Sequence, residues 1–200
     1  MAVTKQSEAR PDSGRDRIMD EAATLFLQRG YEATSLRVLA GVVGIKAGSI
    51  YYHFASKDEL LTEILRRGIA VMQVAFDEAQ QISSGQSSVA RIEVHVRAHL
   101  AALYENGPYT AAHVVTFRTA PAAVREQIVP IRDAYEARWT RVLRELQADG
   151  AIPPMIDVNV ARLVLFGAMN SSIDWFDFGR GNLDRFAAAI THQFWNGVAA

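Results

Sequence analysis

Two histidines have a spacing that could bind a metal. His95 and His99 stand four residues apart in a segment of helical periodicity, so both would lie on one helix face, as paired metal ligands do. No glutamate follows His95 as in a His-Glu-x-x-His motif, and no third ligand is evident. Histidines in helices are also found as ordinary packed or surface residues. The sequence therefore predicts no metal site and no cofactor.

Motifs of the common enzyme classes are also missing. The chain has no Gly-x-Ser-x-Gly, no P-loop, no dinucleotide fingerprint and no pair of carboxylates that could be assigned to acid–base catalysis. Its 200 residues include no cysteine, which excludes disulfide scaffolds, thiolate zinc sites and cysteine nucleophiles. An enzyme is therefore not the expected class of protein.

A third pattern, from Ser35 to Phe54, combines small turn residues with basic and aromatic ones. Ala40 is small enough for two helices to cross closely, and Gly44 supplies backbone freedom, so the spacing predicts a helix-turn-helix. The apolar positions that would form its small core are Leu36, Leu39, Val43, Ile45, Ile50 and Phe54. The residues left facing outward on the second helix are Lys46, Ala47, Ser49, Tyr52 and His53. A helix in the major groove contacts bases mainly with its N-terminal residues, so DNA is the expected partner. A tight helical hairpin with ordinary turn glycines is the alternative.

The distribution of charge along the chain is consistent with DNA binding by this segment. Residues 33–57 contain three cations, Arg37, Lys46 and Lys57, and no acid, whereas the whole chain has a net charge of −1. After Lys57 there are 13 Lys and Arg against 16 Asp and Glu. Ser35 can cap its helix while its backbone N–H faces a phosphate. Lys57 falls in the first turn of the next helix, which is unfavourable for a cation unless an anion is near.

The surrounding elements are all expected to be helical, because no period-2 strand pattern appears. Residues 1–12 are predicted to be a disordered arm, Ser13 to cap the first helix with Asp16, and Gly30 to end it with Tyr31 folded back. Pro130 is expected to kink a long helix, either beside a cavity or for plain packing. The later helices are expected at 35–42, 46–53, 56–82, 89–105, 109–119, 121–149, 157–176 and 183–198. The fold class is therefore all-α with nine helices. A polar N-terminus and no apolar run of ~18–20 residues predict a cytoplasmic protein with no membrane contact.

Residues 15–65 resemble the DNA-binding domain of the TetR family of transcriptional repressors. The resemblance rests on Arg29-Gly30-Tyr31, Thr34-Ser35-Leu36-Arg37 and Ala40-Gly41-Val42, and above all on the run Gly48-Ser49-Ile50-Tyr51-Tyr52-His53-Phe54 leading into Ser56-Lys57-Asp58-Glu59-Leu60. It covers about a quarter of the chain, and the remainder agrees with the family in length and helix count.

The resemblance implies specific DNA contacts. Arg37 matches a position that reaches a base, Ser49 a contact at the groove floor, and Lys57 a phosphate-binding lysine. Whether the Tyr51 ring belongs to the core, with only its hydroxyl functional, is left open. Val38 departs from the acid or polar group common in the family. The predicted DNA-binding residues are Ser35, Arg37, Lys46, Ala47, Gly48, Ser49, Tyr51, Tyr52, His53 and Lys57.

The resemblance also implies two domains: a DNA-binding domain at 13–56, and a ligand-binding and dimerisation domain at 57–200. A homodimer through the last two helices would place two reading helices on a palindromic operator. Gly167, Ala168 and Ser171 on one of these helices would allow close approach of another helix. The other carries an apolar stripe of Phe186, Ile190, Phe194 and Val198, which is either interface or intrachain core.

Candidate ligand-binding residues occur on several of the later helices. They are His99, His113, Phe117, Tyr135, Trp139, Asn170 and Trp175. Trp175-Phe176 resembles the end of the penultimate helix in family members that sense acyl-CoA thioesters, although the proline usual in the following loop is absent, with Phe178 near its place. The sequence does not identify the effector, and an acyl-CoA or another hydrophobic metabolite is one candidate. The predicted function is a homodimeric repressor released from operator DNA by a small molecule. A small hydrolase and a protein-interaction module that has lost DNA binding are the alternatives.

Overall fold

Capping side chains set where several helices begin. The computed structural model describes residues 14–177, 179 and 181–199, and this part of the chain forms nine α-helices, two 3₁₀ turns and no strand. Ser35 caps α2 (Leu36–Val43), its Oγ accepting from the Val38 N–H at 3.2 Å. Ser56 caps α4 (Lys57–Ile82) in the same way through the Glu59 N–H at 3.0 Å. The predicted all-α, nine-helix fold is confirmed.

Two helices end earlier than predicted. The remaining helices are α1 (Gly14–Arg29), α3 (Ala47–His53), α5 (Ser88–Tyr104), α6 (Pro108–Thr116), α7 (Ala122–Ala148), α8 (Val158–Ser171) and α9 (Leu183–Val198). The segments predicted as helices 109–119 and 157–176 close with the 3₁₀ turns η1 (Phe117–Thr119) and η2 (Ser172–Asp174). Thr116 and Ser172 donate side-chain hydrogen bonds to carbonyls of the preceding turn at these points, and a tighter last turn is a common helix ending. The predicted arm and the Ser13 cap lie outside the described residues.

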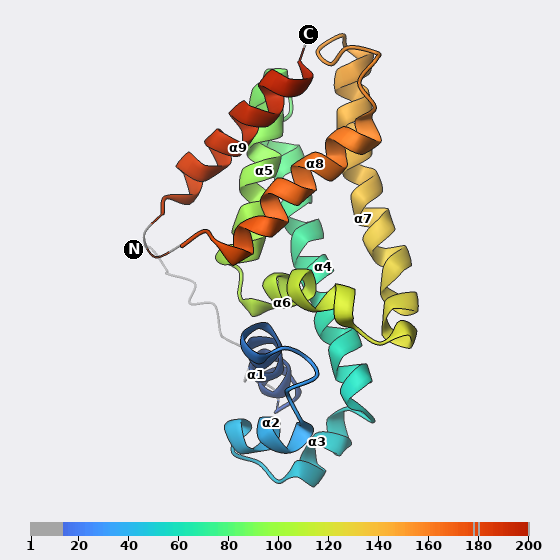
Figure 1. Ribbon diagram of the computed structural model, residues 1–200, viewed down its shortest axis with the longest axis vertical. Coiled ribbons are helices and arrows are strands. Elements are labelled where there is room, and N and C mark those ends of the chain that lie inside the picture. Colours follow the sequence, from blue (N-terminus) through green and yellow to red (C-terminus); the bar gives the residue numbers. More distant parts are fainter. Residues whose placement is uncertain (1–13, 178, 180, 200) are drawn as a thin grey trace, which may run out of the picture.

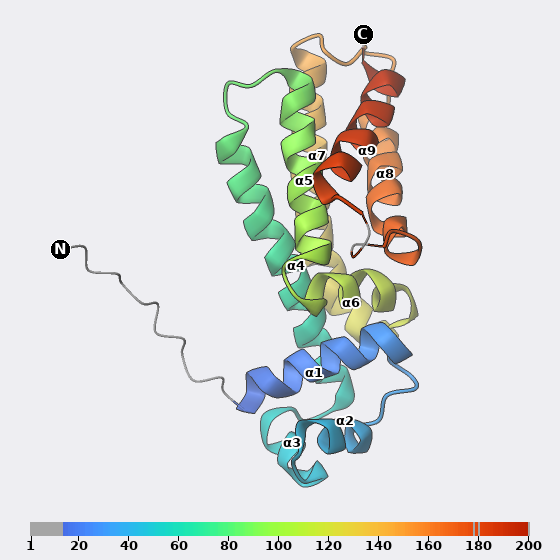
Figure 2. The same cartoon turned by 90° about the vertical axis from the view of Figure 1, so that its left-hand side faces the viewer.

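The helices form a small head on a larger body (Figure 1). Helices α1, α2 and α3 make the head, and α4 extends from the head into the body, where α5 and α7 pack against it. On the far side of the body α8 packs on α7, and α9 packs on α5 and α8. Helix α6 lies between α1 and the body and touches α1, α4 and α5 (Figure 2). It is therefore in contact with both parts of the molecule.

The apolar stripe of the last helix is core. Phe194 is 8% exposed, and Phe186, Ile190 and Val198 are half-buried against the core of the same chain. The stripe therefore contributes to the core of its own chain, and three of its four side chains keep some exposed surface. The residues that α9 exposes are small or polar, among them Ala189, His192, Gln193 and Asn196.

Gly68 sets how closely α6 crosses α4. A Cβ atom at Gly68 would lie 2.6 Å from the Tyr109 carbonyl oxygen and 2.9 Å from the His113 Cβ, so only glycine fits without moving the backbone. The Thr110 hydroxyl donates to the Gly68 carbonyl at 3.2 Å across the same crossing. A glycine inside a helix costs about 1 kcal/mol relative to alanine. Here it allows the contact that places His113 against the body.

No helix in the described part of the chain is both long and apolar enough to cross a bilayer.

Candidate DNA-binding surface and ligand cavity

The turn between α2 and α3 has the predicted geometry. Gly44 adopts φ +77°, the left-handed conformation that glycine reaches at least cost, and its N–H bonds to the Ala40 carbonyl at 2.9 Å. Ala40 is buried at the crossing of the two helices. Of the six predicted core positions, Leu39, Val43, Ile50 and Phe54 are buried and Leu36 and Ile45 are half-buried. The two short helices are therefore held rigidly on a common apolar base.

The opposite face of this pair is open to solvent. Ser35 and Arg37 at the start of α2 and Lys46, Ala47, Gly48 and Ser49 at the start of α3 are all on the outside of the head, exposed or half-exposed. Arg37 and Lys46 have no ion pair or side-chain hydrogen bond within the described residues. Because Ala47 and Gly48 are small, another molecule can approach the backbone of α3 closely. This face therefore offers a polyanion two unpaired cations, Arg37 and Lys46, beside the N-terminus of α3.

The aromatic residues at the end of α3 differ in exposure. Tyr51 is 59% exposed and Tyr52 87%, so the ring of Tyr51 is outside the core and the question left open by the sequence is answered. His53 is half-buried, with its ring edge-on to Tyr52 at a centroid distance of 5.1 Å. Both tyrosine hydroxyls are therefore available to a partner molecule.

Lys57 is held by its own chain. Its Nζ lies 3.9 Å from the centroid of the Tyr31 ring, and Tyr31 donates a hydrogen bond to Asp58. Burial lowers the pKa of Lys57, an effect opposed by the nearby carboxylates of Glu32 and Asp58. Anions near Lys57 are thus supplied by Glu32 and Asp58 of its own chain, beside the Tyr31 ring, so its position in the first turn does not by itself indicate a phosphate.

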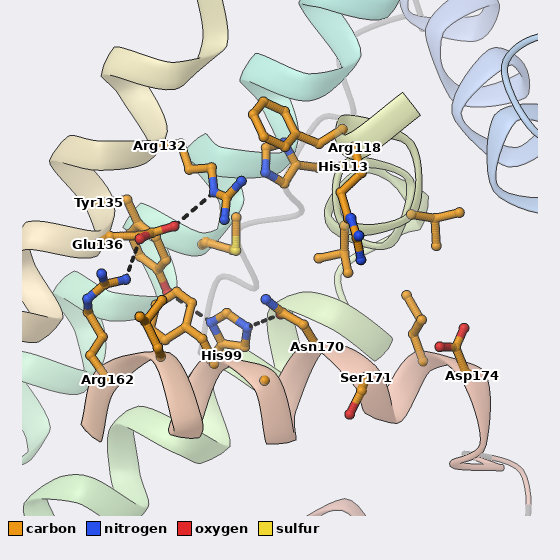
Figure 3. Close-up of a pocket in the computed structure, with 18 residues that line it drawn as sticks. His99, His113, Arg118, Arg132, Tyr135, Glu136, Arg162, Asn170, Ser171 and Asp174 are labelled. Carbon is orange, nitrogen blue, oxygen red and sulfur yellow. Dashed lines mark hydrogen bonds and ion pairs between the residues drawn. The ribbon is translucent and has the colours of Figure 1, made fainter. Parts of the chain in front are cut away.

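A cavity of about 500 Å³ lies in the body between α4, α5, α6, α7 and α8, with η1 and η2 at its edge (Figure 3). Five of the seven predicted ligand-binding residues line it: His99, His113, Phe117, Tyr135 and Asn170. Trp139 does not, because it is fully buried behind them among Phe76, His95, His99 and Phe166. Trp175 is 62% exposed, because the chain leaves η2 away from the cavity and the ring packs on Phe186.

A directed chain of hydrogen bonds crosses the back wall of the cavity. The Trp139 indole N–H donates to the Tyr135 hydroxyl at 3.0 Å. That hydroxyl lies 3.0 Å from His99 Nδ1, and His99 Nε2 lies 3.0 Å from Asn170 Oδ1. Since the Asn170 oxygen can only accept, a neutral His99 with its proton on Nε2 satisfies every member. Burial lowers the pKa of His99 to about 4, which agrees with the neutral form.

Stability is expected to fall as the pH drops from about 6.5 to about 5. Burial also lowers the pKa of His113 to about 3. Both histidines therefore bind protons more weakly in the folded chain than in the unfolded chain, so acid favours unfolding. The stabilisation is complete above about pH 6.5 and decreases below it. Urea unfolding of His99→Gln should show a loss over this range that is roughly 2 kcal/mol smaller than in the unmodified chain. Equal losses would contradict the neutral assignment of His99.

Charged residues in the cavity wall were not predicted. Glu136 accepts hydrogen bonds from Arg132 Nε at 2.8 Å and from Arg162, and Arg118 reaches the same space from η1 (Figure 3). The sequence contains one indication of these charged residues, because Arg132 and Glu136 stand four residues apart on a predicted helix, where an ion pair is expected. Arg118 and Arg162 stand alone on separate elements, so only the packing of the helices brings them to this site.

Two family models match the chain. Residues 18–64 match the family model of the bacterial regulatory proteins of the tetR family, and residues 85–198 match that of the tetracyclin repressor-like C-terminal domain. The chain is 30% identical over 184 residues to the HTH-type transcriptional repressor KstR2 of Mycolicibacterium smegmatis, covering 88% of this chain and 86% of that protein.

Solved structures have the same architecture. The TetR family transcriptional regulator PfmR from Thermus thermophilus has a TM-score of 0.78 and 27% identity, over 90% of this chain and 98% of that one. AibR, solved in complex with isovaleryl coenzyme A and operator DNA, has a TM-score of 0.80 and 20% identity, over 90% of this chain and 97% of that one. The second likeness shows a shared fold.

Proposed function

The chain belongs to the TetR family of bacterial regulatory proteins, and we propose that it is a homodimeric repressor that leaves a palindromic operator when a small molecule occupies the cavity. It is a DNA-binding transcriptional regulator and not an enzyme. The observation that carries the proposal is the exposed, acid-free face of α2 and α3, held on a buried core. We assign residues 13–56 to DNA binding and 57–200 to ligand binding and dimerisation.

DNA contacts are assigned from exposure and position. Arg37 is free to form a bidentate contact with a guanine, and Ser49 is placed for the groove floor. Ser35, Lys46, Ala47, Gly48, Tyr51, Tyr52 and His53 are assigned to the backbone and groove edge. Lys57 is assigned a phosphate contact. It can make this contact either by moving away from the Tyr31 ring or while its Nζ stays over that ring.

We assign the dimer interface to the last two helices, α8 and α9, and the residues that α8 leaves uncovered support this assignment. Val160, Leu163 and Val164 are each more than half exposed, and Gly167 and Ala168 continue the same exposed surface. Apolar side chains grouped on one exposed helix are typical of an interface. A two-fold dimer would set the two α3 helices ~34–36 Å apart, one turn of DNA.

Helix α6 offers a route from the cavity to the head. His113 on α6 lines the cavity, while Tyr109 on the same helix donates a hydrogen bond to Asp20 of α1. Arg67 of α4 lies 4.4 Å over the Tyr109 ring and pairs with Asp16 of α1 at 3.2 Å. A ligand that shifts α6 would thus change the setting of α1. Such a ligand would release DNA only if it binds more tightly to the chain with α1 in the shifted position than to the chain with α1 in the DNA-binding position.

We assign the effector to the hydrophobic metabolites, with acyl-CoA thioesters as one class to test. Met72, Phe117 and Phe166 make much of the cavity wall apolar. The structural relative AibR was solved with isovaleryl coenzyme A.

The proposal is tested by selecting genomic fragments that bind the chain at low salt and footprinting the strongest. A two-fold symmetric footprint is expected, with log affinity falling linearly as log salt rises. Absence of any selected fragment would refute the proposed function.

Lys46→Gln is expected to reduce the salt dependence of operator binding. Lys46 is exposed and has no partner within the described residues, so we assign it a phosphate contact. Loss of one such contact lowers the slope of log affinity against log salt by about 1 per protomer, hence by about 2 for the dimer. Fluorescence anisotropy between about 50 and about 200 mM salt measures the slope. Arg144→Gln, a change at an exposed position on α7, should leave it unaltered.

A further inference from the structure

The charges around the cavity do not balance. Its wall carries three guanidinium groups, Arg118, Arg132 and Arg162, and two carboxylates, Glu136 and Asp174. Glu136 serves both Arg132 and Arg162, and Asp174 is exposed at the edge. One carboxylate shared by two partly enclosed guanidiniums leaves a positive charge that an anion would neutralise.

All three arginines keep donors without a partner within the described residues, and in Arg162 the unpartnered donor is a buried Nε. Arg132 uses Nε for Glu136 and lies 4.7 Å from the Phe117 ring centroid, while its terminal nitrogens have no partner within the described part of the chain. Arg118 has no side-chain partner there either, and both side chains extend toward the same space in Figure 3. Guanidinium groups bind carboxylates and phosphates through paired, charge-assisted hydrogen bonds.

His113 contributes a neutral polar side chain to the cavity wall. The side chain is 4% exposed and lines the cavity, yet its Nδ1 has no hydrogen-bond partner within the described residues. Burial keeps the ring neutral by lowering its pKa, so it adds no charge of its own. The atom itself is buried, and the ring interacts with the Leu65 backbone, so a ligand group reaches Nδ1 only if the ring moves.

Much of the remaining wall is apolar, beside the polar groups of His99, Tyr135, Asn170 and Ser171. Met72, Phe117, Leu163, Phe166 and Ile173 line the cavity, whose volume of about 500 Å³ is in the range of small-molecule sites. An inorganic anion would leave these surfaces without contact.

We propose that the cavity binds a molecule with an apolar part and an anionic group, with Arg118 and Arg132 holding the anionic group and the apolar wall holding the apolar part. This inference rests on one part of the proposed function, namely that the effector binds in this cavity. The anion is either the carboxylate of a free acid or a phosphate of an acyl thioester, and both present the same chemistry to the arginines.

Calorimetry on the full chain tests this with 4-phenylbutyrate, 4-phenylbutanamide and 4-phenylbutyryl-coenzyme A. The acid or the thioester is expected to bind at least about tenfold more tightly than the uncharged amide. Arg118→Gln and Arg132→Gln should each weaken binding of that anion by roughly tenfold to a hundredfold and leave the amide unchanged. Whichever of the two anions responds to both substitutions identifies the source of the charge.

Arg141→Gln is the matched control, because Arg141 is an exposed arginine of α7 that does not line the cavity. Arg118 is exposed and unpaired, so its variant should fold even if loss of the Arg132–Glu136 pair disturbs α7.

Three results would overturn the inference: equal affinity for acid, thioester and amide, unchanged anion affinity in Arg118→Gln, or no binding of either anion at millimolar concentration. Operator binding without ligand, measured on the same preparations, reports on the proposed function separately.

Discussion

Replacing Arg37 by alanine is expected to weaken operator binding by roughly 30-fold to more than about 10,000-fold. Arg37 lies at the first turn of α2 and has no partner within the described residues, so its guanidinium is free for a base. A bidentate arginine–guanine contact contributes about 1–3 kcal/mol, and a dimer on a palindrome makes two of them. The loss of about 2–6 kcal/mol corresponds to that range of affinity.

The measurement is anisotropy with the footprinted operator and with operators changed at one base pair of each half-site. Arg37→Ala should also lose discrimination at the position that Arg37 contacts, and at no other. Arg141→Ala, made at an exposed arginine on the far part of α7, should bind as the unmodified chain does. If Arg37→Ala keeps both affinity and discrimination, Arg37 does not contact a base.

Trp139→Ala is expected to lower the free energy of unfolding by about 3–5 kcal/mol. Trp139 is fully buried, with edge-on contacts to Phe76, His95 and Phe166. Its indole N–H also donates to the Tyr135 hydroxyl, so truncation removes both packing and the first donor of the chain that reaches His99. Single domains are stable by only about 5–15 kcal/mol, so this one change removes a large part of the total.

Urea unfolding followed by circular dichroism measures the effect as a lower midpoint at unchanged slope. Trp175→Ala is the matched control. Trp175 is 62% exposed and keeps edge-on contacts with Phe176 and Phe186, so truncation there should lower stability by no more than about 1.5 kcal/mol. Similar losses in the two variants would contradict the observed burial of Trp139 and exposure of Trp175.

The pattern of small residues that predicted the helix-turn-helix is confirmed in its details. Ala40 is buried at the crossing, and Gly44 has the left-handed conformation that the turn requires. Both features depend on residues within a few positions of one another. The same holds for the caps at Ser35 and Ser56, whose oxygens accept from the N–H three residues later.

Predictions about partners that are distant in the sequence were less successful. The sequence left open whether the stripe on α9 was core or interface, and whether the Tyr51 ring was buried. Helical periodicity shows that residues share a face, but it does not show which other helix covers that face. Trp139 and Trp175 are both tryptophans of segments predicted to be helical, and only their tertiary neighbours make one core and the other surface.

The sequence by itself determined the helical class, the caps, the turn at Gly44 and the family, because each depends on local hydrogen bonds, backbone preference or a contiguous run of residues. The tertiary structure decided which residues surround the cavity. Arg118, Arg132 and Arg162 come from η1, α7 and α8, and Gly68 must allow α6 to cross α4 before His113 can join them. Which residues meet at a site built from separate helices depends on how the faces of those helices pack. The spacing of residues along the chain does not predict that packing.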